Sequence, residues 1–310
     1  MESMIMKNII LNSGNKMPIF GLGTADPMHD VKIPVWVKGR LLNALYRRTV
    51  YKLMWIIRGF KMSYAIKEAL KTGYRMIDTS SSYNNGYFIK LGIKWSKIKR
   101  EELFIITRIS NQEQWNSSVI ESVNKSLHEL NIDYIDLFMF HWPVPDMFLN
   151  TWKDMENIYK EGLVKSIGLA NCHEHHIEDI LKIATIVPTV NEFEIHPLMT
   201  QEKLVEFCKS KSIVPMAYTP IGRMHPKIIN NQELLKIAEK YKKSVPQIVL
   251  RWHIQRGIPA IPRSMNINNI KKNIDIFDFE LTNNEMISVG KVNENMRLRY
   301  NPDNCDFKKL

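Results

Sequence analysis

Short apolar runs alternate along this chain with longer stretches whose apolar residues recur at every third or fourth position. The short runs predict buried β-strands, and the longer stretches predict amphipathic helices. We predict strands over residues 19–22, 75–78, 103–108, 135–141, 165–171, 189–195, 213–218 and 259–262. Helices are predicted over 63–71, 117–130, 151–161, 177–184, 201–209, 231–240 and 246–256. This alternation predicts a parallel sheet, and eight such units predict an α/β fold closed as a (β/α)8 TIM barrel.

Two apolar segments, 8–11 and 17–22, flank the turn-forming residues 13–16 near the N-terminus. This pattern predicts a β-hairpin that leads into the first barrel strand. A barrel commonly reaches 310 residues as one domain, and no linker or low-complexity tract divides the chain. We therefore expect residues 1–310 to form a single barrel domain and the protein to be a monomer.

Residues 26–61 interrupt the alternation. Apolar residues in this segment fall on one face of a predicted helix and basic residues on the other. The apolar face is formed by Leu42, Leu45, Val50, Leu53, Ile56 and Ile57. Three interpretations stay open: an extra helix packed on the barrel, a basic helix that contacts a membrane surface or a protein partner, or inserted sequence without an evolved role.

The net charge of +11 is concentrated in the same segment. Residues 31–61 contain no acid and eight bases, namely Lys32, Lys38, Arg40, Arg47, Arg48, Lys52, Arg58 and Lys61. Removing these eight charges from +11 leaves +3, with both signs mixed over the rest of the chain. The basicity is therefore local, and we do not expect nucleic-acid binding.

The three cysteines, Cys172, Cys208 and Cys305, are far apart and odd in number. They argue against a disulfide framework and favour a reducing compartment. Residues 1–16 lack the apolar run of a secretory signal, and no stretch approaches the roughly 18 apolar residues of a membrane span. We expect a cytoplasmic protein without a transmembrane segment.

Polar or aromatic residues stand at the carboxyl ends of the predicted strands, where barrels of this kind place their chemistry. These residues are Asp78, Arg108, His141 with Trp142, Asn171, Glu192 with Glu194, Tyr218, and Arg263 with Ser264. Each of them alone also suits a buried or capping role. Their convergence on one rim of the barrel favours a functional site.

The residue types at this rim suit the polarisation of a carbonyl group. Tyr83, five residues after Asp78, can donate a proton, although an unperturbed tyrosine has a pKa of about 10. A cation at Arg108 can lower that pKa, Asp78 can orient the cation, and His141 can hold a carbonyl oxygen. Arg263 and Ser264 precede a helix predicted from about residue 267, a suitable place for a phosphate.

Three histidines crowd the start of the helix predicted after residue 173, within His173-Glu174-His175-His176. Their spacing does not place all three on one helix face, so we predict a solvated helix start and no metal site. The strand ends also lack a His-x-His pair or a carboxylate cluster. A metal-dependent barrel hydrolase is therefore the least favoured of the functions considered.

Motifs along nearly the whole chain resemble those of the aldo-keto reductase family. They include residues 17–24 (MPIFGLGT), 73–79 (GYRMIDT), 141–143 (HWP), 162–168 (GLVKSIG), 194–197 (EIHP) and 261–264 (IPRS). Only residues 26–61 fall outside the resemblance. No Gly-x-Gly-x-x-Gly motif is present, as expected for a family that binds its dinucleotide without a Rossmann fold.

The resemblance implies hydride transfer from NADPH to a carbonyl, with oxidation by NADP⁺ as the reverse reaction. It assigns Tyr83 as the general acid beside Asp78, Arg108 and His141, and Ala25 and Trp142 to the substrate pocket. It assigns the cofactor to Thr24, Asn171, Glu192, Tyr218, Thr219, Ile221, Arg263, Ser264, Asn269 and Asn273. Among these, Tyr218 would stack on the nicotinamide, Asn171 would hold its carboxamide, and Arg263 with Ser264 would bind the 2′-phosphate.

The chain departs from the family pattern mainly at the nicotinamide end of this site. Arg108 stands in place of the usual catalytic Lys, and Glu192 in place of a Gln. Smaller departures are Ala170 for Ser, Gly86 for Glu, Ala25 for Trp, and Asn269 and Lys272 for an Arg and a Glu. Short loops after residues 142 and 222, and a short tail from residue 293, predict an open pocket.

Two functions remain. The first is NADPH-dependent reduction of small aldehydes or ketones to alcohols. The alternative is a weakened or inactive relative that binds nucleotide or a partner, which Arg108, Ala170 and Glu192 favour.

Overall fold

The computed structural model describes residues 7–29, 31–35 and 37–309. Seven parallel strands form a nearly closed barrel, each hydrogen-bonded to the next in sequence order. They are β3 (Leu22–Gly23), β4 (Met76–Asp78), β5 (Phe104–Ile109), β6 (Leu137–Phe140), β7 (Ile167–Ala170), β8 (Val190–Glu194) and β9 (Val214–Tyr218). The predicted TIM barrel is confirmed.

The predicted eighth strand closes the barrel without forming a regular strand. Isolated parallel bridges join Ala260 to Phe20 and to Ala217. Pro259 and Pro262 flank this contact and have no amide hydrogen, which interrupts a regular ladder. A side chain at Gly23 would lie 2.6 Å from the carbonyl oxygen of Ile261, so only glycine permits this close approach.

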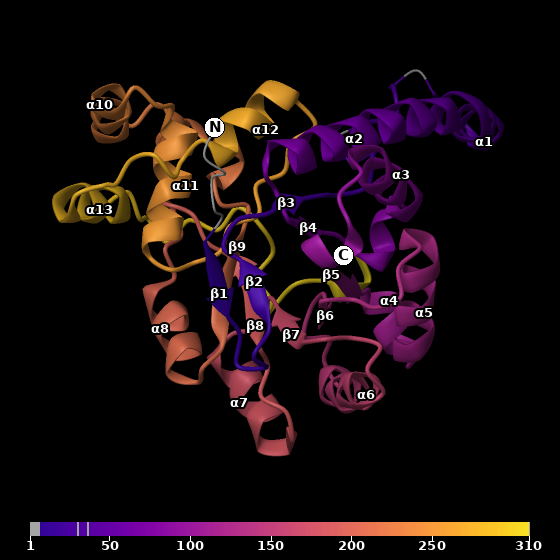
Figure 1. The fold of residues 1–310 in the computed structure, drawn as a ribbon. Helices are drawn as coiled ribbons and strands as arrows, with labels where there is room; N and C mark the ends of the chain where they lie inside the picture. The colour runs from indigo at the N-terminus through magenta and orange to yellow at the C-terminus, as the bar shows by residue number, and fades with distance from the viewer. Residues whose placement is uncertain (1–6, 30, 36, 310) are drawn as a thin grey trace.

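Helices surround the barrel (Figure 1). They are α2 (Lys52–Thr72), α3 (Gly86–Ser96), α5 (Val119–Leu130), α6 (Phe148–Lys160), α7 (Glu174–Ile183), α8 (Glu202–Ser210), α10 (Gln232–Tyr241), α11 (Val245–Gln255) and α12 (Ile267–Ile274). Shorter helices are α4 (Asn111–Trp115), α9 (Pro226–Ile229) and α13 (Asn283–Gly290). Most predicted helices lie within a few residues of these bounds, but the helix predicted over 63–71 is only the second half of α2, and α3, with two glycines, was not predicted from the pattern.

The N-terminal hairpin, β1 (Asn8–Ile10) with β2 (Lys16–Pro18), is confirmed and covers the amino ends of the barrel strands. Asn12 donates to the carbonyls of Pro188 (2.9 Å) and Ser212 (3.0 Å), just before β8 and β9. Asn15 donates to the carbonyl of Lys165 (2.6 Å), just before β7. Because the hairpin covers the amino end, the carboxyl end remains for a site.

The segment that interrupts the sequence pattern forms the beginning of the first barrel helix. Helix α1 (Arg40–Tyr46) continues through a π-helical turn (Arg47–Tyr51) into α2, which ends at Gly73 in the left-handed conformation. The interpretation that the apolar face packs on the barrel is wrong for five of its six residues, which are 40–60% exposed. They are Leu42, Leu45, Val50, Leu53 and Ile57. In the described part of the chain, no helix is both long and apolar enough to span a membrane.

Candidate active site

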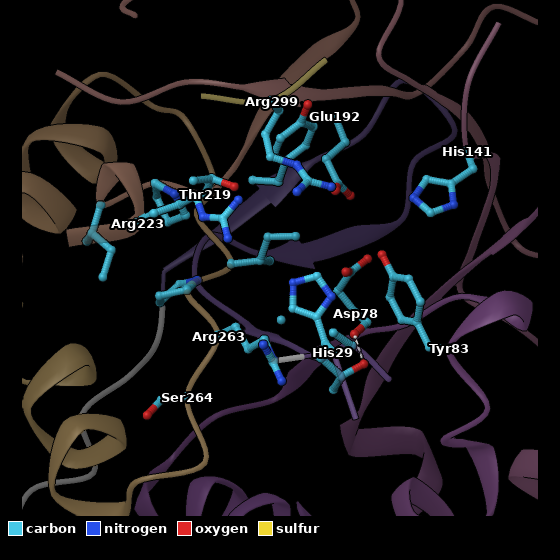
Figure 2. A pocket seen from close by; sticks show the side chains of 18 of the residues that line it. His29, Asp78, Tyr83, His141, Glu192, Thr219, Arg223, Arg263, Ser264 and Arg299 are labelled. Atoms are coloured by element: carbon cyan, nitrogen blue, oxygen red, sulfur yellow. Dashed lines mark hydrogen bonds between the residues drawn. The ribbon is translucent and has the colours of Figure 1, made fainter. Parts of the chain in front are cut away.

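A cavity of about 430 Å³ opens at the carboxyl ends of the strands (Figure 2). Most of the predicted site residues line it: Thr24, Ala25, Asp78, Tyr83, Arg108, His141, Trp142, Asn171, Glu192, Tyr218, Thr219, Ile221, Arg263 and Ser264. Asn269 and Asn273 do not line it. Both lie on α12, where Asn269 is exposed and Asn273 is buried, so their contacts to an adenosine remain predictions.

Arg108, at the carboxyl end of β5, is 2% exposed and makes four hydrogen bonds. Its Nη1 and Nη2 donate to the two carboxylate oxygens of Glu192 at 2.9 and 3.0 Å. Nη2 also donates to Asp78 Oδ1, and Nε donates to the carbonyl of Thr79 at 3.1 Å. The planar fork thus joins β4 and β8 across the barrel mouth, and its two-nitrogen contact to the Glu192 carboxylate is one that the single nitrogen of a lysine cannot reproduce.

Tyr83 and His141 lie side by side in the cavity. Their ring centroids are 5.8 Å apart in an edge-to-face arrangement. Tyr83 ends a 3₁₀ turn (Ser81–Tyr83) after β4, and His141 directly follows β6. The hydroxyl of Tyr83 and the imidazole of His141 can therefore both reach one substrate oxygen.

Both rings keep their neutral forms near neutral pH. Burial raises the pKa of the Tyr83 phenol above its usual value, and the Glu192 carboxylate raises it further, while Arg299 and Arg263 lower it. Burial also holds the pKa of His141 well below its usual value, with Arg108 and Arg299 acting in the same direction. Because Arg108 is taken up by two carboxylates, the cations that favour ionisation of the phenol are Arg299 and Arg263.

An amide and a phenol form another part of the cavity wall. The Tyr218 hydroxyl donates to Asn171 Oδ1 at 2.6 Å, and Asn171 Nδ2 donates to the carbonyl of His141 at 2.9 Å. Asn171 and Thr219 follow directly after β7 and β9 with φ of 60° and 52°. A β-branched residue such as Thr219 rarely adopts a positive φ, and strain of this kind is concentrated at functional sites.

Sequence reasoning missed three charged or polar residues of the cavity: His29, Arg223 and Arg299. His29 lies in the segment outside the family resemblance. Arg223 follows Gly222 in the loop after β9, where its φ is 52°. Arg299 lies in the C-terminal tail, more than a hundred residues after β8. No periodicity links these positions to the strand ends, so the sequence offered no signal for them.

The short tail nevertheless reaches the cavity, because β8 holds it. The buried carboxylate of Glu194 accepts the backbone N–H groups of Leu298 (2.7 Å) and Arg299 (3.3 Å). Farther along, Phe307 packs edge-to-face on Trp142 with ring centroids 6.4 Å apart. The tail therefore forms one side of the pocket.

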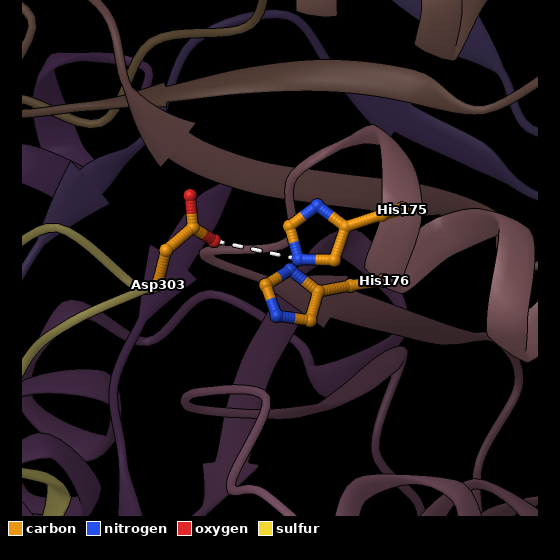
Figure 3. Close-up of side chains that lie close together, drawn as sticks. All are labelled: His175, His176 and Asp303. Atoms are coloured by element: carbon orange, nitrogen blue, oxygen red, sulfur yellow. Dashed lines mark ion pairs between the residues drawn. The ribbon is translucent and has the colours of Figure 1, made fainter.

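A second tail contact involves the histidines at the start of α7 (Figure 3). His173 Nδ1 lies 2.8 Å from Asp303 Oδ2, and His175 Nε2 lies 3.4 Å from Asp303 Oδ1. Possible ligand atoms of His175, His176 and Asp303 lie within 4.8 Å of one another. However, His176 Nδ1 already accepts the backbone N–H of His173, and the start of a helix disfavours a cation. We interpret the cluster as a tail anchor, and the absence of a metal stays a prediction.

The family model for the aldo/keto reductase family matches residues 61–294. The chain belongs to the aldo/keto reductase family. The glyoxal reductase of Bacillus subtilis is 36% identical over 99% of this chain and 100% of its own length. The methylglyoxal reductase DkgA of Escherichia coli is 36% identical over 77% of this chain and 87% of its own length.

Solved structures agree. An aldo-keto reductase enzyme from a Medee basin deep-sea metagenome library is 34% identical, covers 97% of this chain and 100% of its own, and superposes with a TM-score of 0.84. An aldo-keto reductase of Bombyx mori in complex with NADP is 32% identical over 96% of each chain, with a TM-score of 0.82. In this aldo/keto reductase, the family match begins at Lys61, after the exposed beginning of the first helix.

Proposed function

We propose that this aldo/keto reductase uses NADPH to reduce small aldehydes or ketones to alcohols, with Tyr83 as the general acid. The observation that carries the proposal is the position of Tyr83 and His141, which face one cavity with their rings 5.8 Å apart. The names of its bacterial relatives, glyoxal reductase and methylglyoxal reductase, suggest small dicarbonyl compounds as first substrates to test.

The residues of the cavity fit a nicotinamide dinucleotide. Tyr218 offers a flat ring beside the amide of Asn171, as a nicotinamide and its carboxamide require. Arg263 and Ser264 lie at another side of the cavity, shortly before α12 begins, and supply a cation and a hydroxyl for a phosphate (Figure 2). When bound, the reduced nicotinamide supplies a hydride to the carbonyl carbon.

Side chains of the protein bind and protonate the carbonyl oxygen. The neutral imidazole of His141 donates an N–H to that oxygen and holds it beside the phenol. The Tyr83 hydroxyl gives its proton to the oxygen as negative charge develops there, which completes the alcohol. Tyr83 then regains a proton from solvent. Arg299 and Arg263 stabilise the transient phenolate, since both lower the pKa of Tyr83.

Tyr83→Phe tests this assignment. We expect kcat for NADPH consumption with glyoxal, methylglyoxal or propanal to fall about a thousandfold, because the ring is kept and only the proton donor is lost. NADPH binding, followed by fluorescence, should stay the same. Equal turnover by the native protein and the Tyr83→Phe variant would show that another group supplies the proton.

A second candidate is a nucleotide-binding protein with little turnover, and the Arg108–Glu192 pair favours it. The pair occupies the base of the cavity, and the Glu192 carboxylate raises the pKa of the proton donor. Binding of NADPH without turnover by the native protein, together with turnover by an Arg108→Lys/Glu192→Gln variant, would establish this candidate. Turnover by the native protein would exclude it.

A further inference from the structure

The beginning of the first helix carries an apolar stripe that no described part of the chain covers. Large apolar residues recur along it at intervals of 3, 8, 4, 3 and 4 positions, the spacing of one helix face. They are Leu42 (40% exposed), Leu45 (58%), Leu53 (58%), Ile57 (60%), Phe60 (44%) and Tyr64 (46%). Single exposed apolar residues are ordinary, but a continuous stripe marks an interaction surface.

The stripe continues onto the neighbouring helix α3 through aromatic residues. Phe60 stacks on Trp95 with ring centroids 6.3 Å apart and planes 13° from parallel. Trp95 is 39% exposed, and Tyr87, on the same helix, is 54% exposed. Tryptophan and tyrosine are enriched where an apolar phase meets water, because their rings are apolar and their edges polar.

Unpaired cations flank these apolar side chains. Arg48 and Lys52 are exposed on the first helix, Lys94 is exposed on α3, and Lys97 is exposed directly after it. Within the described residues, none of these four forms an ion pair with a carboxylate. Residues 31–61 and 79–100 both contain bases and no acid. The two helices therefore present one positive surface.

Close packing of the first helix against α3 involves a different side of the helix from the stripe and is tightest near two glycines. A side chain at Gly59 would overlap the ring of Phe88, and one at Gly92 would lie 2.7 Å from the carbonyl oxygen of Ser63. These glycines let α2 and α3 pack tightly from residue 59 onward. Toward its beginning the first helix runs beyond α3 (Figure 1). Trp55 still packs edge-to-face on Phe88, with ring centroids 4.7 Å apart, whereas Leu42, Leu45 and Leu53 stay exposed.

We propose that this surface, the face of residues 42–64 together with Tyr87 and Trp95, docks on an anionic lipid bilayer. A helix with exposed leucines and aromatics and flanking cations is typical of helices that lie in the headgroup region. Each cation near an anionic bilayer adds to the attraction, and a fluid surface needs no acids at matching positions. A protein partner would instead need acidic side chains positioned opposite the cations of this single convex helix.

The docking orientation follows from the fold. The first helix runs antiparallel to the barrel strands, so its exposed beginning lies at their carboxyl ends, as does the cavity. The loop that leads into it contributes His29 to the cavity wall. A docked protein would therefore hold its pocket close to the bilayer surface.

Vesicle co-sedimentation of the full-length protein tests the proposal without any substrate, so it does not depend on reductase activity. We expect binding to phosphatidylcholine vesicles that contain about one-third phosphatidylserine, and little binding to pure phosphatidylcholine. Added salt should weaken the binding, because it screens the attraction between the cations and the lipid.

Two pairs of substitutions locate the contact. Leu53→Gln/Ile57→Gln should weaken binding about tenfold, since glutamine keeps helix propensity but removes apolar surface. Arg48→Glu/Lys52→Glu should weaken it about 25-fold or more. Matched controls lie elsewhere: Leu235→Gln/Ile287→Gln, at 41% and 55% exposure, and Lys153→Glu/Lys160→Glu on α6. The controls should bind as the native protein does, and circular dichroism checks that every variant is folded.

Several results would overturn the proposal. They are no binding to anionic vesicles, equal binding to neutral ones, or full binding by both helix variants. A native dimer that Leu53→Gln/Ile57→Gln converts to a monomer would show instead that a second copy covers the stripe. Binding to an acidic polymer such as polyglutamate, but not to vesicles, would indicate an acidic protein partner.

Discussion

The mouth of the barrel and the beginning of its first helix both carry arginines, and the two environments differ completely. Arg108 is 2% exposed and is held by Asp78, Thr79 and Glu192. Arg48 is exposed and has no carboxylate partner within the described residues. A buried charge must be matched inside the fold, whereas an exposed and unmatched one costs the fold nothing. Arg48 is therefore available to a partner outside the chain, as the proposed bilayer contact requires.

The largest effect on stability should come from removing the cation that balances the two buried carboxylates at the mouth of the barrel. Arg108→Leu leaves the Asp78 and Glu192 carboxylates buried without a cation, so we expect the free energy of unfolding to fall by about 3–5 kcal/mol. Denaturant unfolding measures this loss. Arg108→Lys/Glu192→Gln keeps a cation beside Asp78 and removes the carboxylate charge at position 192, so no buried charge is left without a partner and the loss should be much smaller. An equal loss in both variants would mean that packing, and not charge, dominates at this position.

This pair also shows the limit of reading the site from the sequence. Arg108 and Glu192 each appear as an isolated departure from a family pattern, 84 positions apart. Only the parallel register of β4 to β8 brings them within 3 Å of one another. Together they form a compensated change, with an arginine fork matched to a carboxylate. Periodicity predicts which face a residue occupies and does not predict its partner across the barrel.

The fold and the strand-end residues were predictable for a related reason. Residues such as Asp78 and His141 directly follow apolar runs, and parallel strands bring their ends to one rim. Arg299 and Asp303 lie in a tail without periodicity, and backbone hydrogen bonds to Glu194 place it. The extended beginning of the first helix was predicted as an amphipathic segment whose role stayed open, because periodicity does not show which face, if any, packs on the barrel.

The next effect concerns Arg299, a cation at the mouth that stays available to the cavity. Arg299→Met should lower kcat about tenfold, because one of the two cations that lower the Tyr83 pKa is lost. Arg299→Lys keeps the charge and should retain most of the activity. If both variants lose activity alike, Arg299 acts through its shape or its tail contacts and not through its charge.

A smaller effect should follow from pH. The pKa of His141 lies well below its usual value, so the imidazole is neutral at and above about pH 6. The pKa of Tyr83 is raised, so the phenol keeps its proton through at least about pH 9. Between these limits kcat/KM for reduction should change less than about threefold. A steep fall in kcat/KM as the pH drops below about 6.5 would show that His141 is as basic as a histidine in water.

The smallest expected effect is on stability, and it distinguishes the exposed beginning of the first helix from its buried end. Leu53→Gln/Ile57→Gln changes residues that are 58% and 60% exposed, so the free energy of unfolding should stay within about 0.5 kcal/mol of the native value. Ile66→Ala, on the same helix two residues past the end of the stripe, removes a side chain that is 1% exposed and should cost about 2–4 kcal/mol. Denaturant unfolding of both variants makes the comparison. A large loss in the double variant would show that the stripe packs against the chain itself, and the surface would then serve the fold and not a bilayer.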